Sequence, residues 1–297
     1  MKYPQRHFWA LVLSLVLWGF SFPALKIALR SNSPVTIIAY RYGFVFLIVL
    51  PYFLWRHRKD MSVLIRNKAL FVLGVSNWAG SILQFAGLQM TSSIKSAVLT
   101  QTTVVAVPLL ALFLLGERLD WAKVIAIVLS LAGAVMLSTN LDFSRLGDAS
   151  SFAGDGLTVV AAVFWAIFIV YTRKLTQRLD VFWLIWANTI ITFLLSLVTA
   201  VATDQLAIDR TGLGLSLFLA MFCTIIPLAL YNYSLKVVDA TSSAIIGPLE
   251  TVSAVFLSVL FLGERFSSVG IAGSLLVVAS VYLVDRPRGP YQGGGQR

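Results

Sequence analysis

The chain has few charged residues, few histidines and a single cysteine, and each shortage excludes a class of protein. Only 12% of its 297 residues are charged, against about 25% in soluble domains, so an ordinary water-soluble fold is excluded. Cys223 is the one cysteine. It can form neither an internal disulfide nor a thiolate metal site.

Motifs for enzymatic or ATP-driven chemistry are also missing. The two histidines, His7 and His57, flank apolar runs, and no His-Glu-x-x-His sequence occurs. No phosphate-binding glycine-rich loop is present, which excludes direct ATP coupling by this chain. Intramembrane acid catalysis would use paired acids, and Glu250 is the one acidic residue near the middle of an apolar run. We therefore expect no enzyme, no cofactor and no metal site.

Apolar residues are what the sequence has in excess, at 58% of the chain and a mean hydropathy of +0.86. A helix needs about 20 mostly apolar residues to cross a bilayer. The connections between the apolar runs are short and polar, so no soluble domain is expected. The sequence predicts an all-α integral membrane protein with ten transmembrane helices. These cover residues 8–29, 34–55, 69–90, 94–115, 121–138, 152–173, 180–202, 212–235, 241–262 and 267–284.

An internal repeat organises the ten predicted spans. Gly116-Glu117-Arg118 returns as Gly263-Glu264-Arg265, 147 residues later, and the same shift pairs Trp18 with Trp165 without a gap. A repeat of this kind indicates one structural unit used twice. Each unit has five spans, an odd number, so the second unit is inverted in the membrane. The expected division is a first repeat over 1–147, a second over 148–285 and a disordered tail over 286–297.

The basic residues predict the orientation. With both termini in the cytoplasm, 16 of the 23 Lys and Arg residues lie at the cytoplasmic side and 4 on the opposite side. Such a bias is typical of membrane proteins, so the net charge of +10 does not indicate a nucleic-acid partner. The expected partners are the lipid bilayer and a small-molecule substrate. Because one chain contains both repeats, a monomer can suffice.

Two matching segments carry a resemblance to a known family. They read LLGERLDWAKVIAIVLSLAGAVML at 114–137 and FLGERFSSVGIAGSLLVVASVYL at 261–283, and the repeats open with similar segments at 17–29 and 163–175. Over nearly its whole length the chain resembles the EamA-type drug/metabolite transporters, and among them most the YddG-type amino-acid exporters of bacterial inner membranes. This resemblance implies an inner-membrane location. It also implies a central cavity lined by spans 1, 3, 4, 6, 8 and 9, with spans 5 and 10 peripheral.

We therefore expect a secondary-active or facilitative transporter that exports amino acids or related small metabolites by alternating access. A channel, a lipid flippase, or an exporter of drugs or other metabolites on the same scaffold are the alternatives. The small pumps that resemble half of this scaffold rely on an acidic residue in their first helix. The first span here has none and carries Lys26 instead, which disfavours cation-drug antiport.

Glu250 is the foremost candidate site residue because ionisable residues inside a membrane are costly. It follows Gly247-Pro248, and proline removes a helical hydrogen bond. Freed carbonyls beside a carboxylate suit a substrate ammonium or a proton. The structural alternative is a pair with Lys26 or Lys95. The repeat mate of Glu250 is Thr103, so the carboxylate is not part of a symmetric scaffold.

Aromatic and amide side chains within the spans complete the predicted substrate site. Trp18 and Trp165 are repeat mates near mid-membrane, where they line a cavity or pack in the core. Gln84 and Tyr231 are also mates, and they bond a zwitterion or join helices. The predicted substrate-binding residues are Trp18, Asn77, Trp78, Gln84, Gln101, Trp165, Tyr231 and Glu250.

Other residues are predicted to gate or to shape the fold. Pro23, Pro108 and Pro227 are the expected hinges, and Arg41 closes the outer mouth or attracts a carboxylate. Lys26 and Lys95, if not paired with Glu250, extend toward the headgroups. Glu117 and Glu264 are expected to accept N–H bonds at the start of the helix that follows each of them, where the helix dipole favours a carboxylate.

Overall fold

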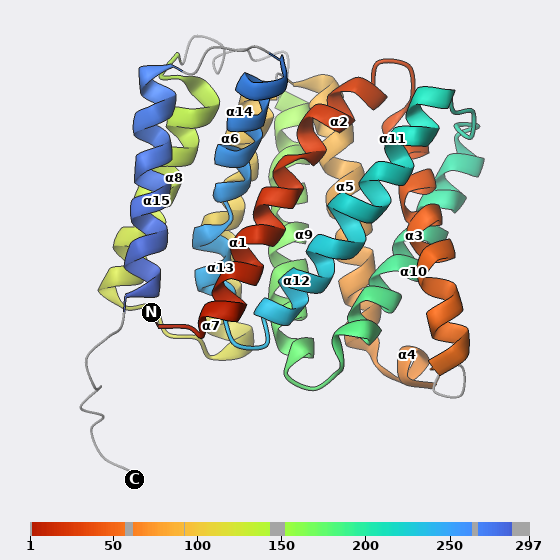
Figure 1. Cartoon of the computed structure of the whole chain (residues 1–297), viewed down its shortest axis with the longest axis horizontal. Helices are drawn as coiled ribbons and strands as arrows, with labels where there is room; N and C mark the ends of the chain where they lie inside the picture. The colour runs from red at the N-terminus through yellow and green to blue at the C-terminus, as the bar shows by residue number, and fades with distance from the viewer. Residues whose placement is uncertain (1, 57–61, 92, 143–151, 263–266, 287–297) are drawn as a thin grey trace.

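The computed structural model describes residues 2–56, 62–91, 93–142, 152–262 and 267–286, and the regular structure in these ranges is helical (Figure 1). The helices are α1 (Gln5–Gly19), α2 (Ser21–Ala28), α3 (Pro34–Arg56), α4 (Ser62–Arg66), α5 (Lys68–Met90), α6 (Ser93–Thr100), α7 (Thr102–Leu115), α8 (Trp121–Thr139), α9 (Phe152–Thr176), α10 (Val181–Ala202), α11 (Arg210–Ala220), η4 (Met221–Ile225), α12 (Ile226–Ser234), α13 (Ala240–Ile246), α14 (Leu249–Leu262) and α15 (Ser268–Asp285).

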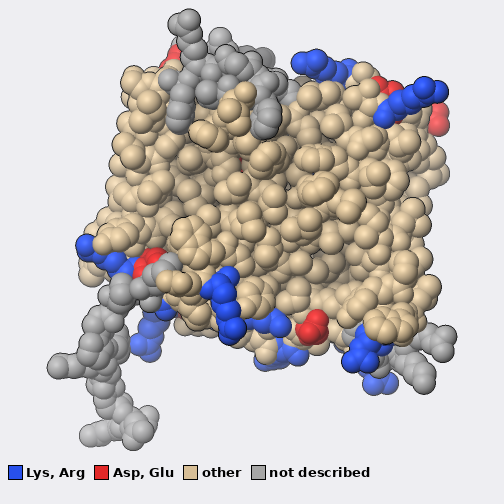
Figure 2. Space-filling view, viewed as in Figure 1, with Lys and Arg blue, Asp and Glu red and all other residues tan. Residues whose placement is uncertain are grey.

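Ten segments in the described residues are long and apolar enough to cross a membrane, which confirms the predicted all-α membrane fold. Figure 2 shows the charged side chains gathered at two opposite edges of the molecule, with an uncharged band between them. Most of the spans are one continuous helix. Spans 1, 4, 8 and 9 are each built from more than one helix and cover Gln5–Leu25, Ser96–Leu115, Arg210–Ser234 and Ala240–Leu257.

Aspartates start four of the helices. In each case the carboxylate accepts a backbone N–H from the first turn, which satisfies a group that has no partner within the helix. Asp120 begins α8, Asp180 begins α10, Asp209 begins α11 and Asp239 begins α13, with bonds of 3.0, 2.8, 2.7 and 2.8 Å. At the other end of a helix, Gly116 stops α7 with a φ of 67°, a left-handed conformation that glycine adopts without steric cost.

Two of the internal breaks lie at equivalent places in the repeats. The break between α6 and α7 is at Gln101, and the break between α13 and α14 is at Gly247 and Pro248. Gln101 and Pro248 are 147 residues apart. Pro248 has no N–H for the helical bond, whereas Gln101 breaks span 4 without a proline. The repeated break is therefore a feature of the shared fold and not of one residue type.

Span 8 contains a different irregularity, the five-residue π-helix η4. Within it the Thr224 hydroxyl donates to the Leu219 carbonyl five residues earlier, at 2.9 Å. Pro227 follows at the start of α12 and has no N–H to donate to the Cys223 carbonyl. The Cys223 carbonyl, whose usual helical partner would be the missing N–H of residue 227, therefore lies within the π-helix.

The packing places Lys2 and Asp285 side by side on one face, here named the terminal face. The Lys2 N–H donates to the Asp285 carbonyl at 2.8 Å, which joins the N-terminus to the end of α15. Helices α8 and α15 pack on each other at one edge of the molecule, α5 runs along α9, and α10 packs against α3 and α5 (Figure 1). Spans 5 and 10 are thus peripheral in the bundle.

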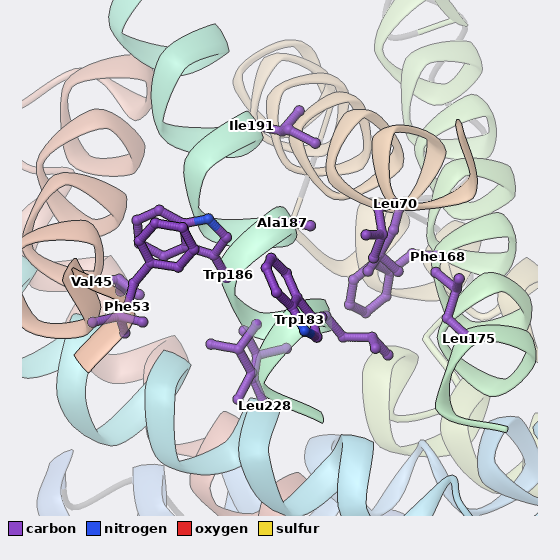
Figure 3. Close-up of a cluster of buried hydrophobic side chains, with 14 of the residues drawn as sticks. Val45, Phe53, Leu70, Phe168, Leu175, Trp183, Trp186, Ala187, Ile191 and Leu228 are labelled. Carbon is purple, nitrogen blue, oxygen red and sulfur yellow. The ribbon is translucent and has the colours of Figure 1, made fainter. Parts of the chain in front are cut away.

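The largest apolar cluster lies among α3, α5, α9, α10 and α12 (Figure 3). Phe53 stacks on Trp186 with ring centroids 4.0 Å apart and nearly parallel planes. Trp183 and Leu228 bury their side chains in the same cluster. This cluster joins the second and third spans to spans of the other repeat, so the two repeats share one core.

Close backbone approach of α8 and α15 depends on glycine, and Gly133→Ala is expected to lower stability by about 1–3 kcal/mol through overpacking. A Cβ at Gly133 would lie 2.5 Å from the Gly273 carbonyl oxygen, an atom that cannot rotate away. Thermal unfolding in detergent measures the effect. Gly156→Ala is the matched control because open space surrounds that position in α9. Equal melting temperatures for the two variants would contradict the close contact.

Candidate functional site

One group of predicted residues gathers where α1, α12 and α13 meet. Trp18 of α1 lies against Tyr231 of α12, with ring centroids 5.0 Å apart and a tilt of 50°. The Tyr231 hydroxyl forms a hydrogen bond of 2.7 Å with the hydroxyl of Ser243 on α13. Tyr231 is buried, whereas Trp18 is half-buried. The indole therefore covers a tyrosine that is already bonded within the protein.

Glu250 lies beside this group, in the first turn of α14 directly after the break in span 9. Helix α1 approaches here at Gly19, where a Cβ would lie 2.7 Å from the Ser253 Cβ and 3.0 Å from the Glu250 carbonyl oxygen. The Glu250 side chain is half-buried. The backbone of Glu250 is therefore packed closely against α1, at the residue that follows Trp18.

Arg41 of α3 approaches the same region from the other side. Its Nε donates to the Thr224 hydroxyl and its Nη2 to the Cys223 carbonyl, each at 2.6 Å. The guanidinium thus bonds the carbonyl that Pro227 leaves without an N–H. Its positive charge also interacts electrostatically with the Glu250 carboxyl. The described side chains therefore place a positive group of span 2, Arg41, and a negative group of span 9, Glu250, within electrostatic reach of each other.

A second group forms between α5 and α9. The Trp165 indole N–H donates to the Gln84 amide oxygen at 3.1 Å, and its ring packs on Gly80, where a Cβ would lie 3.1 Å away. Both side chains are half-buried. The hydroxyl of Thr103, the repeat mate of Glu250, donates to the Thr100 carbonyl at 2.8 Å. The symmetric tryptophans thus have different polar surroundings, tyrosine in one repeat and glutamine in the other.

The remaining predicted residues lie apart from these groups. Asn77 is buried and donates to the Tyr42 and Thr192 hydroxyls at 2.8 and 3.0 Å, joining α3, α5 and α10. The buried indole nitrogen of Trp78 has no hydrogen-bond partner among the described residues. Gln101 is half-buried at the break in span 4. The predicted hinges Pro23, Pro108 and Pro227 lie within α2, within α7 and at the start of α12.

Comparison with known proteins assigns the chain to a family. A model of the EamA-like transporter family matches residues 6–139 and again residues 152–285. The chain belongs to the EamA-like transporter family. It is therefore a multi-pass membrane transporter, and each match covers five of the ten spans.

Individual relatives agree with this assignment. The EamA chain is 28% identical to an uncharacterized transporter of Archaeoglobus fulgidus over 280 residues, which cover 93% of this chain and 84% of the relative. It is 24% identical to a protein of Salmonella typhimurium named a probable amino-acid metabolite efflux pump, with 92% of each chain covered. A solved structure with 17% identity has a TM-score of 0.82 over 95% of this chain and 96% of its own, which supports the fold alone.

The structure corrects one prediction about the Gly-Glu-Arg turns of the EamA repeats. Glu117 does not bond the start of the helix that follows it, because Asp120 already occupies that position at α8. It accepts instead from the Ala240 N–H, the Thr241 N–H and the Thr241 hydroxyl at 2.8, 3.0 and 2.7 Å. A carboxylate of the first repeat thus caps α13 of the second. Glu264 lies outside the described residues, as do the side chains of Lys26 and Lys95.

Sequence reasoning did not select Ser243, Thr224 or Asp239. Ser243 and Ser96 are repeat mates, and that polar pair near the start of an apolar span was the available signal. Thr224 lies in an apolar run, and only the π-helix reveals its role. As for metals, the described residues contain no group of three His, Cys, Asp or Glu side chains that could hold an ion.

Proposed function

We propose that this EamA transporter is a secondary carrier that exports amino acids or related small zwitterionic metabolites by alternating access. The observation that carries the proposal is Glu250, a half-buried carboxylate in the first turn after the break in span 9. Substrate and ion sites in carriers are typically built at such discontinuous helices. No described residue forms a hydrogen bond with this carboxylate, so it is available to an ammonium group or a proton.

The side chains of both candidate groups and Arg41 support a small zwitterionic substrate. Trp18 and Trp165 offer aromatic faces to an ammonium group, and Gln84 offers an amide. Arg41 supplies the positive charge that a substrate carboxylate requires. A mostly uncharged aromatic and amide lining favours broad selectivity. The printed name of the Salmonella relative, an amino-acid metabolite efflux pump, agrees with this substrate class.

Alternating access is supported by the duplication. Two similar units inserted in opposite directions can form two related states, each open to one side. The equivalent breaks at Gln101 and Pro248 give each unit a place to bend, and Pro23, Pro108 and Pro227 are the proposed hinges. We further propose a location in the inner membrane with both termini in the cytoplasm, on the bias of basic residues.

Counterflow in proteoliposomes tests this function. Vesicles containing the purified protein are loaded with an unlabelled amino-acid mixture and diluted into a trace of one radiolabelled amino acid. A carrier is expected to accumulate label transiently above its equilibrium level, and an unlabelled competitor outside the vesicles is expected to suppress this. Protein-free vesicles are the control. Conductance without counterflow would instead support a channel, and movement of a labelled lipid between leaflets would support a flippase.

A further inference from the structure

A charged cluster closes the terminal face around the start of α13. It consists of Lys2, Tyr3, Glu117, Lys123 and Asp239 and is here named the terminal latch. Lys123 Nζ lies 2.9 Å from Asp239 Oδ1, and Lys2 Nζ lies 3.2 Å from Asp239 Oδ2. The Tyr3 hydroxyl bonds both Asp239 and Ser242. Lys123 is 4% exposed, so its charge is removed from water and depends on this partner.

The latch joins three separate parts of the chain. Lys2 and Tyr3 precede α1, Glu117 and Lys123 belong to the α7–α8 connection and the start of α8, and Asp239 begins α13. Glu117 adds its three bonds to Ala240 and Thr241, described above. Because α13 is the first half of the broken span 9, the latch fixes the position of the half-helix that precedes Glu250.

The connection between α12 and α13 is also fixed from its other side. Arg173 Nη1, the Thr176 hydroxyl and the Gln177 amide of the α9 end all donate to the Leu235 carbonyl, at 2.6, 2.9 and 3.3 Å. Deeper in the bundle, small apolar side chains of α7, α9 and α13, including Ala166 and Ala244, bury one another. The bundle is therefore closed at the terminal face by contacts on both sides of the α12–α13 connection.

The latch is not symmetric between the repeats. The shift of 147 residues pairs Glu117 with Glu264, so the carboxylate that caps a half-helix has a counterpart in sequence. The ion pairs have none, because the same shift pairs Asp239 with Ser92, Lys123 with Gly270 and Lys2 with Ala149. An exact inverted repeat would give its two states equal free energies. The extra ion pairs on one face remove that equality.

We propose that the terminal latch holds the terminal face closed and biases the resting transporter toward the state open on the opposite face. This inference rests on the proposed alternating access, since opening the terminal face would separate α13 from α8 and from the N-terminal segment. The first separation breaks the Lys123–Asp239 pair, and the second breaks the Lys2–Asp239 pair. Water entering the opened face would solvate the charges, so the latch shifts the equilibrium without preventing turnover.

Asp239, the carboxylate at the centre of the latch, keeps its negative charge at neutral pH. Burial alone would raise the pKa of Asp239, but the charges of Lys123 and Lys2 and the Tyr3 hydroxyl outweigh it and hold that pKa well below the usual carboxyl range. A carboxyl group with a lowered pKa contributes stability above its ordinary pKa, and this is lost only as pH falls through the lowered value. Asp239 therefore remains ionised between pH 5 and pH 8.

Cysteine accessibility tests the latch without any substrate. The reporter is Ala244→Cys in a Cys223→Ala background. Ala244 is a buried position of α13 that lies deeper in the bundle than the latch. A membrane-impermeant methanethiosulfonate reagent is applied from the terminal face to proteoliposomes of determined orientation. Asp239→Asn keeps an N-cap acceptor but loses the charge, and it is expected to raise the labelling rate about tenfold, the effect of a shift of about 1.4 kcal/mol.

Matched variants distinguish a specific opening of the terminal face from a nonspecific loss of packing throughout the protein. Lys123→Met is expected to match Asp239→Asn, the double variant to add little, and Lys123→Arg to retain the original rate. Asp209→Asn is the control, because Asp209 caps α11 on the opposite face with Asn32 and Gly212 as its partners. Unchanged labelling in both Asp239→Asn and Lys123→Met would overturn the proposal, as would equal increases from both faces. A failure of amino-acid counterflow alone would leave this result standing.

Discussion

Glu250→Gln is expected to reduce amino-acid counterflow by about 10- to 100-fold, since a hydrogen bond to a charged group contributes about 1.5–3 kcal/mol. Glutamine retains the shape of the side chain but cannot neutralise a substrate ammonium or accept a proton. The measurement is counterflow in proteoliposomes, with and without an imposed pH gradient. If Glu250 also carries the coupling proton, the response to the gradient is lost in the variant.

Thr103→Val is the matched control for this experiment. Thr103 occupies the equivalent position of the first repeat, and its hydroxyl is engaged with a carbonyl of its own span. Its loss is expected to change counterflow by no more than about twofold, because such a bond contributes little net free energy. Wild-type transport by Glu250→Gln, with an unaltered response to the gradient, would remove Glu250 from the site.

Arg41→Met is expected to lower the stability of the folded protein by about 3 kcal/mol or more, since each lost bond to a charged group contributes about 1.5–3 kcal/mol. Methionine fills similar space but leaves the Cys223 carbonyl and the Thr224 hydroxyl without the guanidinium. A backbone carbonyl without a partner is especially costly inside a membrane. Thermal unfolding followed by tryptophan fluorescence measures the loss.

Pro227→Ala provides the decisive second variant. Alanine restores an N–H four residues after Cys223, so the carbonyl regains a helical partner without Arg41. The cost of Arg41→Met is therefore expected to fall by about 1 kcal/mol or more in the Pro227→Ala background. Strictly additive effects of the two substitutions would show that Arg41 does not serve the carbonyl that the proline leaves open.

The outline of the fold was predictable because lipid imposes simple requirements on a sequence. Each span needs a long apolar run, and runs such as 121–138 differ from the observed helix Trp121–Thr139 by a residue. The breaks and the π-helix within the spans could not be predicted in this way. The break at Gln101 contains no proline or glycine, and the π-helix Met221–Ile225 reads as ordinary apolar sequence. Such features depend on tertiary packing, which a local pattern does not contain.

The candidate site was predictable in its residue types but not in its pairings. Glu250 and Arg41 were predicted because ionisable side chains inside a membrane are energetically costly. Trp18 and Trp165 were predicted because they occupy equivalent positions in the two repeats. The partners come from other spans, however. Neither the Tyr231–Ser243 bond nor the Trp165–Gln84 bond follows from sequence spacing, because each depends on how two helices are rotated against each other. Asp239 was overlooked because it lies in a loop, where carboxylates are common.

The position of Glu117 has a consequence for biosynthesis. Its bonding partners, Ala240 and Thr241, follow it by 123 and 124 residues. When the first five spans leave the ribosome and enter the bilayer, the groups that this carboxylate will bind have not yet been made. The hydrogen bonds of Glu117 in the first repeat can therefore form only after the start of the ninth span has been synthesised. Folding of the first half of the protein is completed only with the second.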